Sequence, residues 1–274
     1  MSTRYIRFFC VAIFFALICT SGLEAQASGA SLKGMSFNGS TGLFSIPTGR
    51  IGWERSSNFG LDMGYHAIYS DTNVTHIPKV SMSLFNWLEL NAAFDMQPDG
   101  FITPNNGGDS ILGAKIQFPL TNTSLALGGN FQSLNVFNKN STYRYHASQI
   151  YLAATYAGRF FEAPAETTVV VGKTFRENSN DTNIDFGMGF DMILLPRHLG
   201  GIFHWITDFS NFSYSVESFG SDAWYRGVIN SGLRIDLSVI PPFRRFKFVV
   251  DLLITDALDS NRSFAAGAVF GVPF

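Results

Sequence analysis

A histidine and a serine stand two residues apart in the stretch Tyr-His-Ala-Ser. His146 and Ser148 would share one face of an extended strand, because successive side chains of a strand alternate between its two faces. An imidazole beside a hydroxyl can accept the hydroxyl proton and so activate the oxygen as a nucleophile. The pair therefore raises the hypothesis of a hydrolase, which would also need a third group to orient the histidine.

Outer-membrane phospholipases and lipid A deacylases contain a similar His-x-Ser pair. In those families an Asn-Gly typically follows the serine, whereas Gln149 and Ile150 follow it here. No carboxylate or amide is spaced to orient His146, and a junction between a loop and a strand accounts for both polar residues. We therefore predict that the protein is not an enzyme and keep a lipid hydrolase as an alternative.

The sequence predicts no metal site, cofactor site or nucleic-acid site. The remaining histidines stand singly, with no ligand spacing such as His-x-x-x-His, at His66, His76, His198 and His204. No glycine-rich loop with the spacing of a phosphate site is present. The net charge is -2, and no basic cluster is larger than the pair Arg244 and Arg245, whereas a nucleic-acid partner needs a basic stripe.

Charged residues recur inside otherwise apolar stretches, on the parity opposite the apolar side chains. Charges on a lipid-facing surface would cost a few kcal/mol each, so we predict that these residues line the interior of a barrel. Both signs are present, which favours ion pairs that fill and stiffen a narrow lumen; a polar channel with mild cation preference is the functional alternative. The residues are Asp62, Lys79, Glu89, Asp95, Lys115, Asp185, Asp191, Arg234, Asp236, Lys247 and Asp251.

The elements that carry these charges are strands. In Phe59–Tyr69 the odd positions are apolar, and the stretch 80–96 reads as a hairpin with matched faces around a tight turn at Phe85 and Asn86. Alternation returns in 110–118, 184–194, 228–237 and 247–255. Lys173 follows the run Val169–Val171, which is apolar on both parities, so its direction is left open.

Short and long connections alternate along the chain. Short ones are expected at 85–86, 119–123, 194–199 and 240–245, and longer polar ones at 97–109, 136–147 and 176–182. Both ends of an outer-membrane barrel lie in the periplasm, which requires an even number of strands. Reading 201–217 as one long, bulged strand gives about twelve antiparallel strands, with short periplasmic turns and longer external loops.

The first residues predict an export signal. Two arginines precede an apolar run, and Ala25–Ala27 fits a small-x-small cleavage site, so residues 1–27 are expected to be removed. Both cysteines, Cys10 and Cys19, lie in this signal, which excludes disulfides and thiolate zinc sites from the exported chain. A lipoprotein acylated at Cys19 is an alternative, although bulky Ile18 precedes it.

The rest of the chain divides into two parts. Residues 28–57 are rich in Gly and Ser and show no steady alternation, so they are interpreted as a linker, a plug or an extra strand. Residues 58–274 are expected to form the barrel, and no later stretch is apolar for long enough to be a membrane helix. A closed barrel is then the remaining way to cross a membrane with every backbone group paired.

The final twelve residues keep the strand period to the last position. Phe270, Val272 and Phe274 share one parity with the apolar residues before them. This ending resembles the terminal signal that barrel-assembly machinery recognises, and the last strand is expected to pair with the first. We therefore predict that outer-membrane lipid and the assembly machinery are partners of this chain.

Two stretches resemble the start of the YjbH family, outer-membrane proteins linked to exopolysaccharide production. Its pattern is similar to G-L-x-x-T-P-T-A-R followed by P-x-x-x-x-S-L-x-P-F-x-W-L-E. The matching residues include Gly42, Leu43, Pro47, Thr48, Arg50, Trp87, Leu88 and Glu89. Ile46 and Gly49 depart from the pattern, and the likeness covers only about residues 40–94.

The resemblance implies a role in exopolysaccharide secretion or surface assembly, with polysaccharide or other envelope proteins as partners. We predict an all-β, non-enzymatic barrel of the bacterial outer membrane. A small-solute channel is the first alternative, and a soluble secreted β-sandwich is another.

Overall fold

The computed structural model describes residues 34–53, 58–70, 74–96, 109–138, 141–160, 162–176, 184–211, 227–243, 245–259 and 262–274. The predicted export signal and both cysteines lie outside these ranges. In the described part of the chain, no helix is both long enough and apolar enough to cross a membrane.

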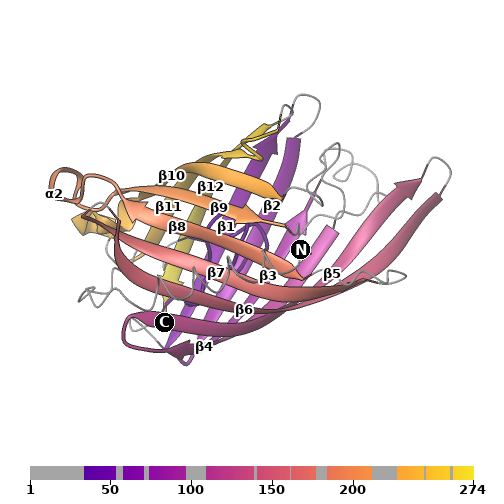
Figure 1. Cartoon of the computed structure of the whole chain (residues 1–274), viewed down its shortest axis with the longest axis horizontal. Coiled ribbons are helices and arrows are strands. Elements are labelled where there is room, and N and C mark those ends of the chain that lie inside the picture. The colour runs from indigo at the N-terminus through magenta and orange to yellow at the C-terminus, as the bar shows by residue number, and fades with distance from the viewer. Residues whose placement is uncertain are drawn as a thin grey trace, which may run out of the picture.

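Twelve strands form one closed antiparallel barrel, as the alternation predicts (Figure 1). Each strand pairs with its neighbours in sequence. The strands are β1 (Phe59–Tyr69), β2 (Val74–Leu84), β3 (Leu88–Asp95), β4 (Asp109–Pro119), β5 (Thr123–Asn138), β6 (Ser141–Phe160), β7 (Ala163–Arg176), β8 (Asp185–Ile193), β9 (Phe203–Ser210), β10 (Val228–Asp236), β11 (Lys247–Thr255) and β12 (Ser263–Pro273).

The barrel closes between its first and last strands. β12 runs antiparallel to β1 from Gly60 opposite Pro273 to Tyr69 opposite Phe264. Closure leaves no sheet edge with unpaired backbone groups, which is the condition for a sheet to cross lipid.

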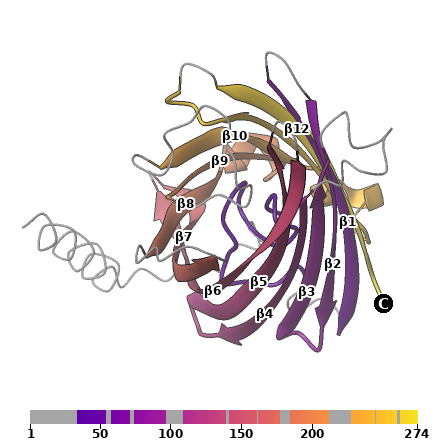
Figure 2. The same cartoon turned by 90° about the vertical axis from the view of Figure 1, so that its right-hand side faces the viewer.

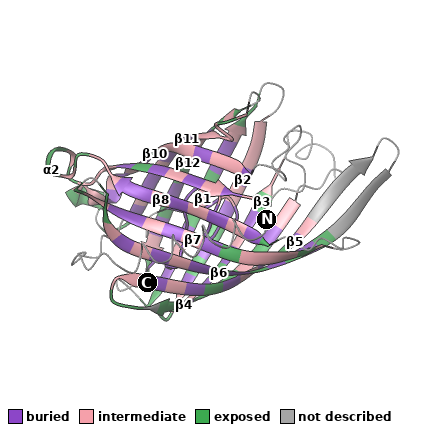
Figure 3. Ribbon diagram, viewed as in Figure 1, coloured by how far each residue is buried: buried purple, intermediate pink, exposed green. Residues whose placement is uncertain are grey.

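The two faces of the barrel differ in polarity, and the alternation of burial along the strands is visible in Figure 3. Met63 and Leu112 on the outer face are 54% and 56% exposed, whereas their inward neighbours in the same strands, Asp62 and Lys115, are each 0% exposed. An apolar exterior around a charged interior is the pattern of a barrel that spans the outer membrane. Lys173 shares its parity with outward-facing Val171 and Phe175, which assigns it to the outer face.

One end of the barrel, which we call the turn end, holds the start of β1, the end of β12 and short connections. The predicted tight turn is confirmed, because Phe85 and Asn86 adopt left-handed φ angles of 54° and 61° between β2 and β3. Short helices connect the strands elsewhere at this end: α2 (Pro196–Leu199), η3 (Leu237–Val239) and η4 (Pro241–Phe243). The opposite end is called the loop end.

The predicted long loop at 136–147 is wrong. β5 and β6 continue through it as a paired ribbon, down to Asn138 opposite Ser141. The polar composition of this stretch is compatible with strand structure, because a ribbon outside the membrane needs no apolar face. The other two predicted loops, and residues 212–217 of the predicted bulged strand, fall largely or wholly outside the described residues.

Residues 34–53 lie inside the ring of strands, and we call them the inner segment. Figure 2, which looks in from the loop end, shows their indigo trace within the barrel. The inner segment has two isolated bridges, Met35 with Thr41 and Gly42 with Pro47, and is not a strand of the barrel wall. Its apolar residues Leu43, Phe44 and Ile46 pack in one cluster with wall residues that include Tyr151, Val170 and Ile206.

Candidate functional site

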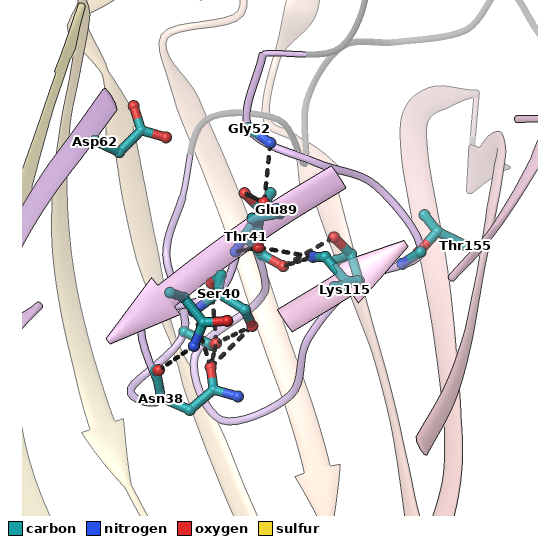
Figure 4. Close-up of polar contacts among 12 residues, drawn as sticks. Asn38, Ser40, Thr41, Gly52, Asp62, Glu89, Lys115 and Thr155 are labelled. Atoms are coloured by element: carbon teal, nitrogen blue, oxygen red, sulfur yellow. Dashed lines mark hydrogen bonds and ion pairs between the residues drawn. The ribbon is translucent and has the colours of Figure 1, made fainter. Parts of the chain in front are cut away.

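The lumen is the candidate site, because most of the predicted charged residues converge there on the inner segment. Glu89 of β3 binds the inner segment and a neighbouring strand (Figure 4). Its carboxylate accepts hydrogen bonds from Thr41 N at 2.8 Å, Thr41 Oγ1 at 2.5 Å and Gly52 N at 3.1 Å. Glu89 therefore joins two separate turns of the inner segment to the wall.

Lys115 of β4 stands directly opposite Glu89 in the strand register. Its ammonium lies 3.1 Å from Glu89 Oε1 and donates to the carbonyl oxygen of Thr41 at 3.0 Å. Both side chains are fully buried, so the pair needs its additional hydrogen bonds to offset the loss of water.

A second ion pair holds the end of the inner segment. Lys247 of β11 lies 2.7 Å from Asp62 of β1 and donates to the carbonyl oxygen of Gly52 at 3.0 Å. The indole of Trp53 donates to Asp62 at 2.8 Å, and the Lys247 ammonium lies 4.9 Å from the indole ring centroid. The end of the inner segment is thus fixed to β1 and β11.

A third group contains Arg234 of β10 and Asp251 of β11. Arg234 Nε lies 2.8 Å from Asp251 Oδ1, and His66 Nε2 of β1 lies 3.2 Å from Asp251 Oδ2. Arg234 also donates to the carbonyl oxygen of Gly42 at 3.0 Å and lies over the Phe44 ring, with Cζ 5.5 Å from its centroid. The guanidinium therefore binds a wall carboxylate and the backbone of the inner segment at the same time.

Two further charged wall residues bind the backbone of the inner segment. Asp208 of β9 accepts hydrogen bonds from the backbone N of Phe44 and of Ser45, each at 2.7 Å. Lys79 of β2 donates to the carbonyl oxygens of Met35 at 3.0 Å and Ser36 at 2.8 Å. The carboxylate of Asp208 thus accepts from backbone N–H groups, and the ammonium of Lys79 donates to backbone carbonyl oxygens. Each buried charge therefore has hydrogen-bond partners.

Two further contacts hold the inner segment near the turn end. Arg50 of the inner segment lies 3.1 Å from Glu166 of β7, and both side chains are buried. The backbone N of Gly49 donates to Thr155 Oγ1 of β6 at 2.8 Å.

The remaining predicted interior charges lie among wall residues. Asp185 accepts from Gln149 Nε2 at 2.8 Å and Thr174 Oγ1 at 2.5 Å, and Asp191 lies 2.7 Å from His204. Asp236 accepts from the backbone N of Ser238 at 2.9 Å, at the start of η3. Asp95 is half-buried at the loop end, where its register partner is Asp109.

The inner segment contains five of the eight quoted motif residues, namely Gly42, Leu43, Pro47, Thr48 and Arg50. Trp87, Leu88 and Glu89 lie at the β2–β3 turn and the start of β3. Glu89 bonds to Thr41, the residue next to Gly42. The two stretches of the motif are therefore in direct contact.

His146 and Ser148 both lie exposed on the outer face of β6 rather than in the lumen. The His146 ring stacks on Phe131, with centroids 5.3 Å apart. Phe270 and Phe274 are exposed at 43% and 75%, and the backbone N of Phe274 donates to Phe59 O at 2.9 Å. Among the described residues, no group of three His, Cys, Asp or Glu is arranged to hold a metal ion.

Sequence reasoning did not single out several buried side chains of the lumen. Asp208 and Glu166 are buried acids that the two-residue strand period could have identified, because each alternates with outward-facing residues of its strand. His66 and His204 were read only as isolated histidines, yet each contacts a wall carboxylate. No strand period could place Arg50, since its position depends on the path of the inner segment.

The sequence matches no protein-family model and no characterised protein sequence. Several solved outer-membrane barrels share the general architecture. The KdgM porin is 9% identical, with 78% of this chain and 99% of that chain covered and a TM-score of 0.48. Omp33 of Acinetobacter baumannii is 10% identical, with 79% and 98% covered and a TM-score of 0.42.

Wzi of Escherichia coli, described as a carbohydrate-binding β-barrel involved in group 1 capsule assembly, is 14% identical. The match covers 77% of this chain and 55% of Wzi, with a TM-score of 0.30. Likeness at this level concerns architecture and assigns no substrate. The closed strand order and the apolar exterior identify the chain as a twelve-stranded β-barrel of the bacterial outer membrane.

Proposed function

We propose that this protein is a non-enzymatic barrel that assists secretion or surface assembly of a polysaccharide, and that its inner segment acts as a plug. The observation that carries the proposal is the seating of residues 34–53 in the lumen. Their backbone is bound by charged side chains of β2, β3, β9, β10 and β11, namely Lys79, Glu89, Asp208, Arg234 and Lys247. A lumen filled in this way is unsuited to constant, unregulated diffusion.

The polysaccharide role rests on the resemblance to the YjbH family. The contact of Glu89 with Thr41 supports that reading, because it joins the motif stretch in the inner segment to the motif stretch in the barrel wall. In this proposal the turn end faces the periplasm and the loop end faces the exterior. Barrel-assembly machinery, polysaccharide and other envelope proteins are the proposed partners.

A small-solute channel is the second candidate. The observation that favours it is the ring of buried charges, which would line a hydrated passage if the inner segment moved aside. Recordings in planar bilayers test this candidate, and a barrel that never conducts, even without its inner segment, would exclude it.

A lipid hydrolase is the least favoured candidate. His146 and Ser148 face outward, where His146 stacks on Phe131. If the purified protein releases fatty acid from phospholipid, comparison with the His146→Ala variant decides whether this pair is responsible. We expect no hydrolysis from either protein.

The polysaccharide role is tested by deleting the gene and measuring surface-bound and secreted glycan. We expect a change in amount or composition that plasmid-borne wild-type protein reverses. The Glu89→Gln variant should restore glycan less well than wild type when its outer-membrane level is equal. Unchanged glycan after deletion would disprove the role.

A further inference from the structure

A row of amide side chains crosses the inner wall from β3 to β6. Asn91 of β3 is opposite Gly113 of β4, Gly113 is opposite Asn130 of β5, and Asn130 is opposite Gln149 of β6. Because the positions are register partners, the side chains follow one another from strand to strand along the hydrogen-bonding direction of the sheet. All three amides are buried, with 6%, 4% and 3% of their surfaces exposed.

Hydrogen bonds fix the orientation of each amide in the row. Asn91 Nδ2 donates to the carbonyl oxygen of Asn38 at 2.8 Å, and Asn130 Nδ2 donates to Gln149 Oε1 at 3.1 Å. Gln149 Nε2 in turn donates to Asp185 at 2.8 Å. The chain of donors leaves Asn91 Oδ1 and Asn130 Oδ1 as free acceptors, and both oxygens are buried without a hydrogen-bond partner.

The two free oxygens converge over Gly113. A Cβ added to Gly113 would lie 2.4 Å from Asn130 Oδ1 and 2.6 Å from Asn91 Oδ1. The inner segment has an unpaired donor on the residue that binds Asn91, because Asn38 Nδ2 is also buried without a partner while the Asn38 carbonyl oxygen accepts from Asn91. Buried polar groups without partners are costly in a protein interior, so two such oxygens at one glycine, with an unpaired donor on the residue that binds Asn91, point to a ligand.

We infer that Asn38, Asn91 and Asn130 form a binding site for the hydroxyl groups of a neutral saccharide. A hydroxyl both donates and accepts a hydrogen bond, so neighbouring hydroxyls can serve two carbonyl oxygens and one amide donor. A metal cation would leave the Asn38 donor unpaired. An anionic sugar would be disfavoured, because the row continues to the carboxylate of Asp185. The inference rests on the proposed function and names the substrate class of the same lumen.

The site lies nearer the loop end than the contact of Gly49 does. In β6, which runs from the loop end to the turn end, Gln149 of the row precedes Thr155, which binds Gly49. Asn38 belongs to the inner segment, so a bound saccharide would contact the wall and the proposed plug together.

The test is isothermal titration calorimetry of the full-length mature protein in detergent, with maltohexaose as the neutral probe and hexagalacturonate as the acidic one. We expect saturable binding of maltohexaose and at least tenfold weaker binding of hexagalacturonate. Asn130→Leu removes one acceptor, and the methyl group of Gly113→Ala, 2.4 and 2.6 Å from the two oxygens, forces both amides to shift. Each should weaken maltohexaose binding at least tenfold.

Two matched variants serve as controls. Gln117→Leu removes another buried, unpaired amide oxygen, which lies nearer the turn end, where Gln117 Nε2 donates to Ser124 at 2.8 Å. Gly129→Ala adds a methyl group in the neighbouring strand, where only the Gln149 carbonyl oxygen lies near, at 3.1 Å. Both controls should bind maltohexaose as wild type does. Heat-modifiable gel mobility verifies that every variant is folded.

The outcomes separate this site from the polysaccharide role. No saturable binding by wild type, as expected if the oxygens hold only ordered water, would overturn the site. Unchanged affinity in both folded site variants would also overturn it, even where gene deletion still alters surface glycan. Loss of affinity in the site variants alone would support the site, even where gene deletion leaves glycan unchanged and removes the polysaccharide role.

Discussion

Glu89 fixes the inner segment to the wall at two places. It accepts three hydrogen bonds from Thr41 and Gly52 and neutralises the buried ammonium of Lys115. Removing one member of a buried ion pair leaves the other charge unpaired, at a cost of about 3–5 kcal/mol. A change at Glu89 should therefore affect the inner segment and the wall together.

We predict that Glu89→Gln loosens the inner segment while the barrel still forms. The amide keeps the size of the side chain but loses the charge that binds Lys115, and it offers one acceptor oxygen where the carboxylate offers two. Thiol labelling of an Ile46→Cys reporter measures the effect, because Ile46 is fully buried in the lumen. The labelling rate by a membrane-impermeant maleimide should rise at least tenfold.

Asp191→Asn is the matched control for this prediction. Asp191 is equally buried and pairs with His204 of the wall at 2.7 Å. This control should lower the temperature at which the folded gel band disappears and leave the labelling rate of Ile46→Cys unchanged. Equal labelling of the two variants would show that Glu89 has no special hold on the inner segment.

At the scale of elements, strands were predictable and the path of the inner segment was not. A strand in a barrel wall meets lipid on one side and the lumen on the other, so residues such as Met63 and Asp62 show the period directly. The inner segment has no such two-sided environment. Its conformation follows from contacts with residues far away in sequence, such as Asp208 and Arg234, and no local pattern encodes those contacts.

The β5–β6 ribbon shows that a stretch without an apolar face can also form strands. β4 pairs with β5 only as far as Ser133, and β7 pairs with β6 only from Ala147, so residues between them pair with each other alone. We predict that this extension contributes little to barrel stability, because a two-stranded ribbon in water is marginally stable. Joining Leu134 to Tyr145 through Asn-Gly should leave the temperature of gel-band loss within a few degrees of wild type. A large decrease would show that the extension supports the barrel.

The last strand provides another prediction at this scale. Phe274 extends the β1–β12 closure by a backbone hydrogen bond to Phe59, and its side chain is exposed. We predict that deleting Phe274 reduces the outer-membrane level of the protein more than its synthesis, because the assembly signal loses its terminal aromatic. Pulse labelling followed by membrane fractionation measures both quantities. Normal outer-membrane levels of the truncated protein would disprove the prediction.

For the whole molecule, the balance of interior charge determines what the lumen would do without the inner segment. Among the described strand residues, the buried carboxylates outnumber the buried Lys and Arg side chains. The carboxylates are Asp62, Glu89, Glu166, Asp185, Asp191, Asp208, Asp236 and Asp251, and the bases are Lys79, Lys115, Arg234 and Lys247. Removing the inner segment also removes Arg50, which leaves Glu166 without this partner. The emptied lumen would carry net negative charge.

We therefore predict that deletion of residues 34–53 converts a mostly closed barrel into a steady, cation-preferring conductor. Wild type in planar bilayers should remain closed for most of the recording, because the backbone of the inner segment is bound on several sides of the ring. The deletion variant should conduct continuously and pass K⁺ in preference to Cl⁻, since the net negative lumen attracts cations.

Heat-modifiable gel mobility must show that the deletion variant is folded. A second variant, full-length Asp208→Asn, weakens the hydrogen bonds to Phe44 and Ser45. It should show brief openings with the same ion preference. Steady conductance of wild type equal to that of the deletion variant would contradict a plugging role.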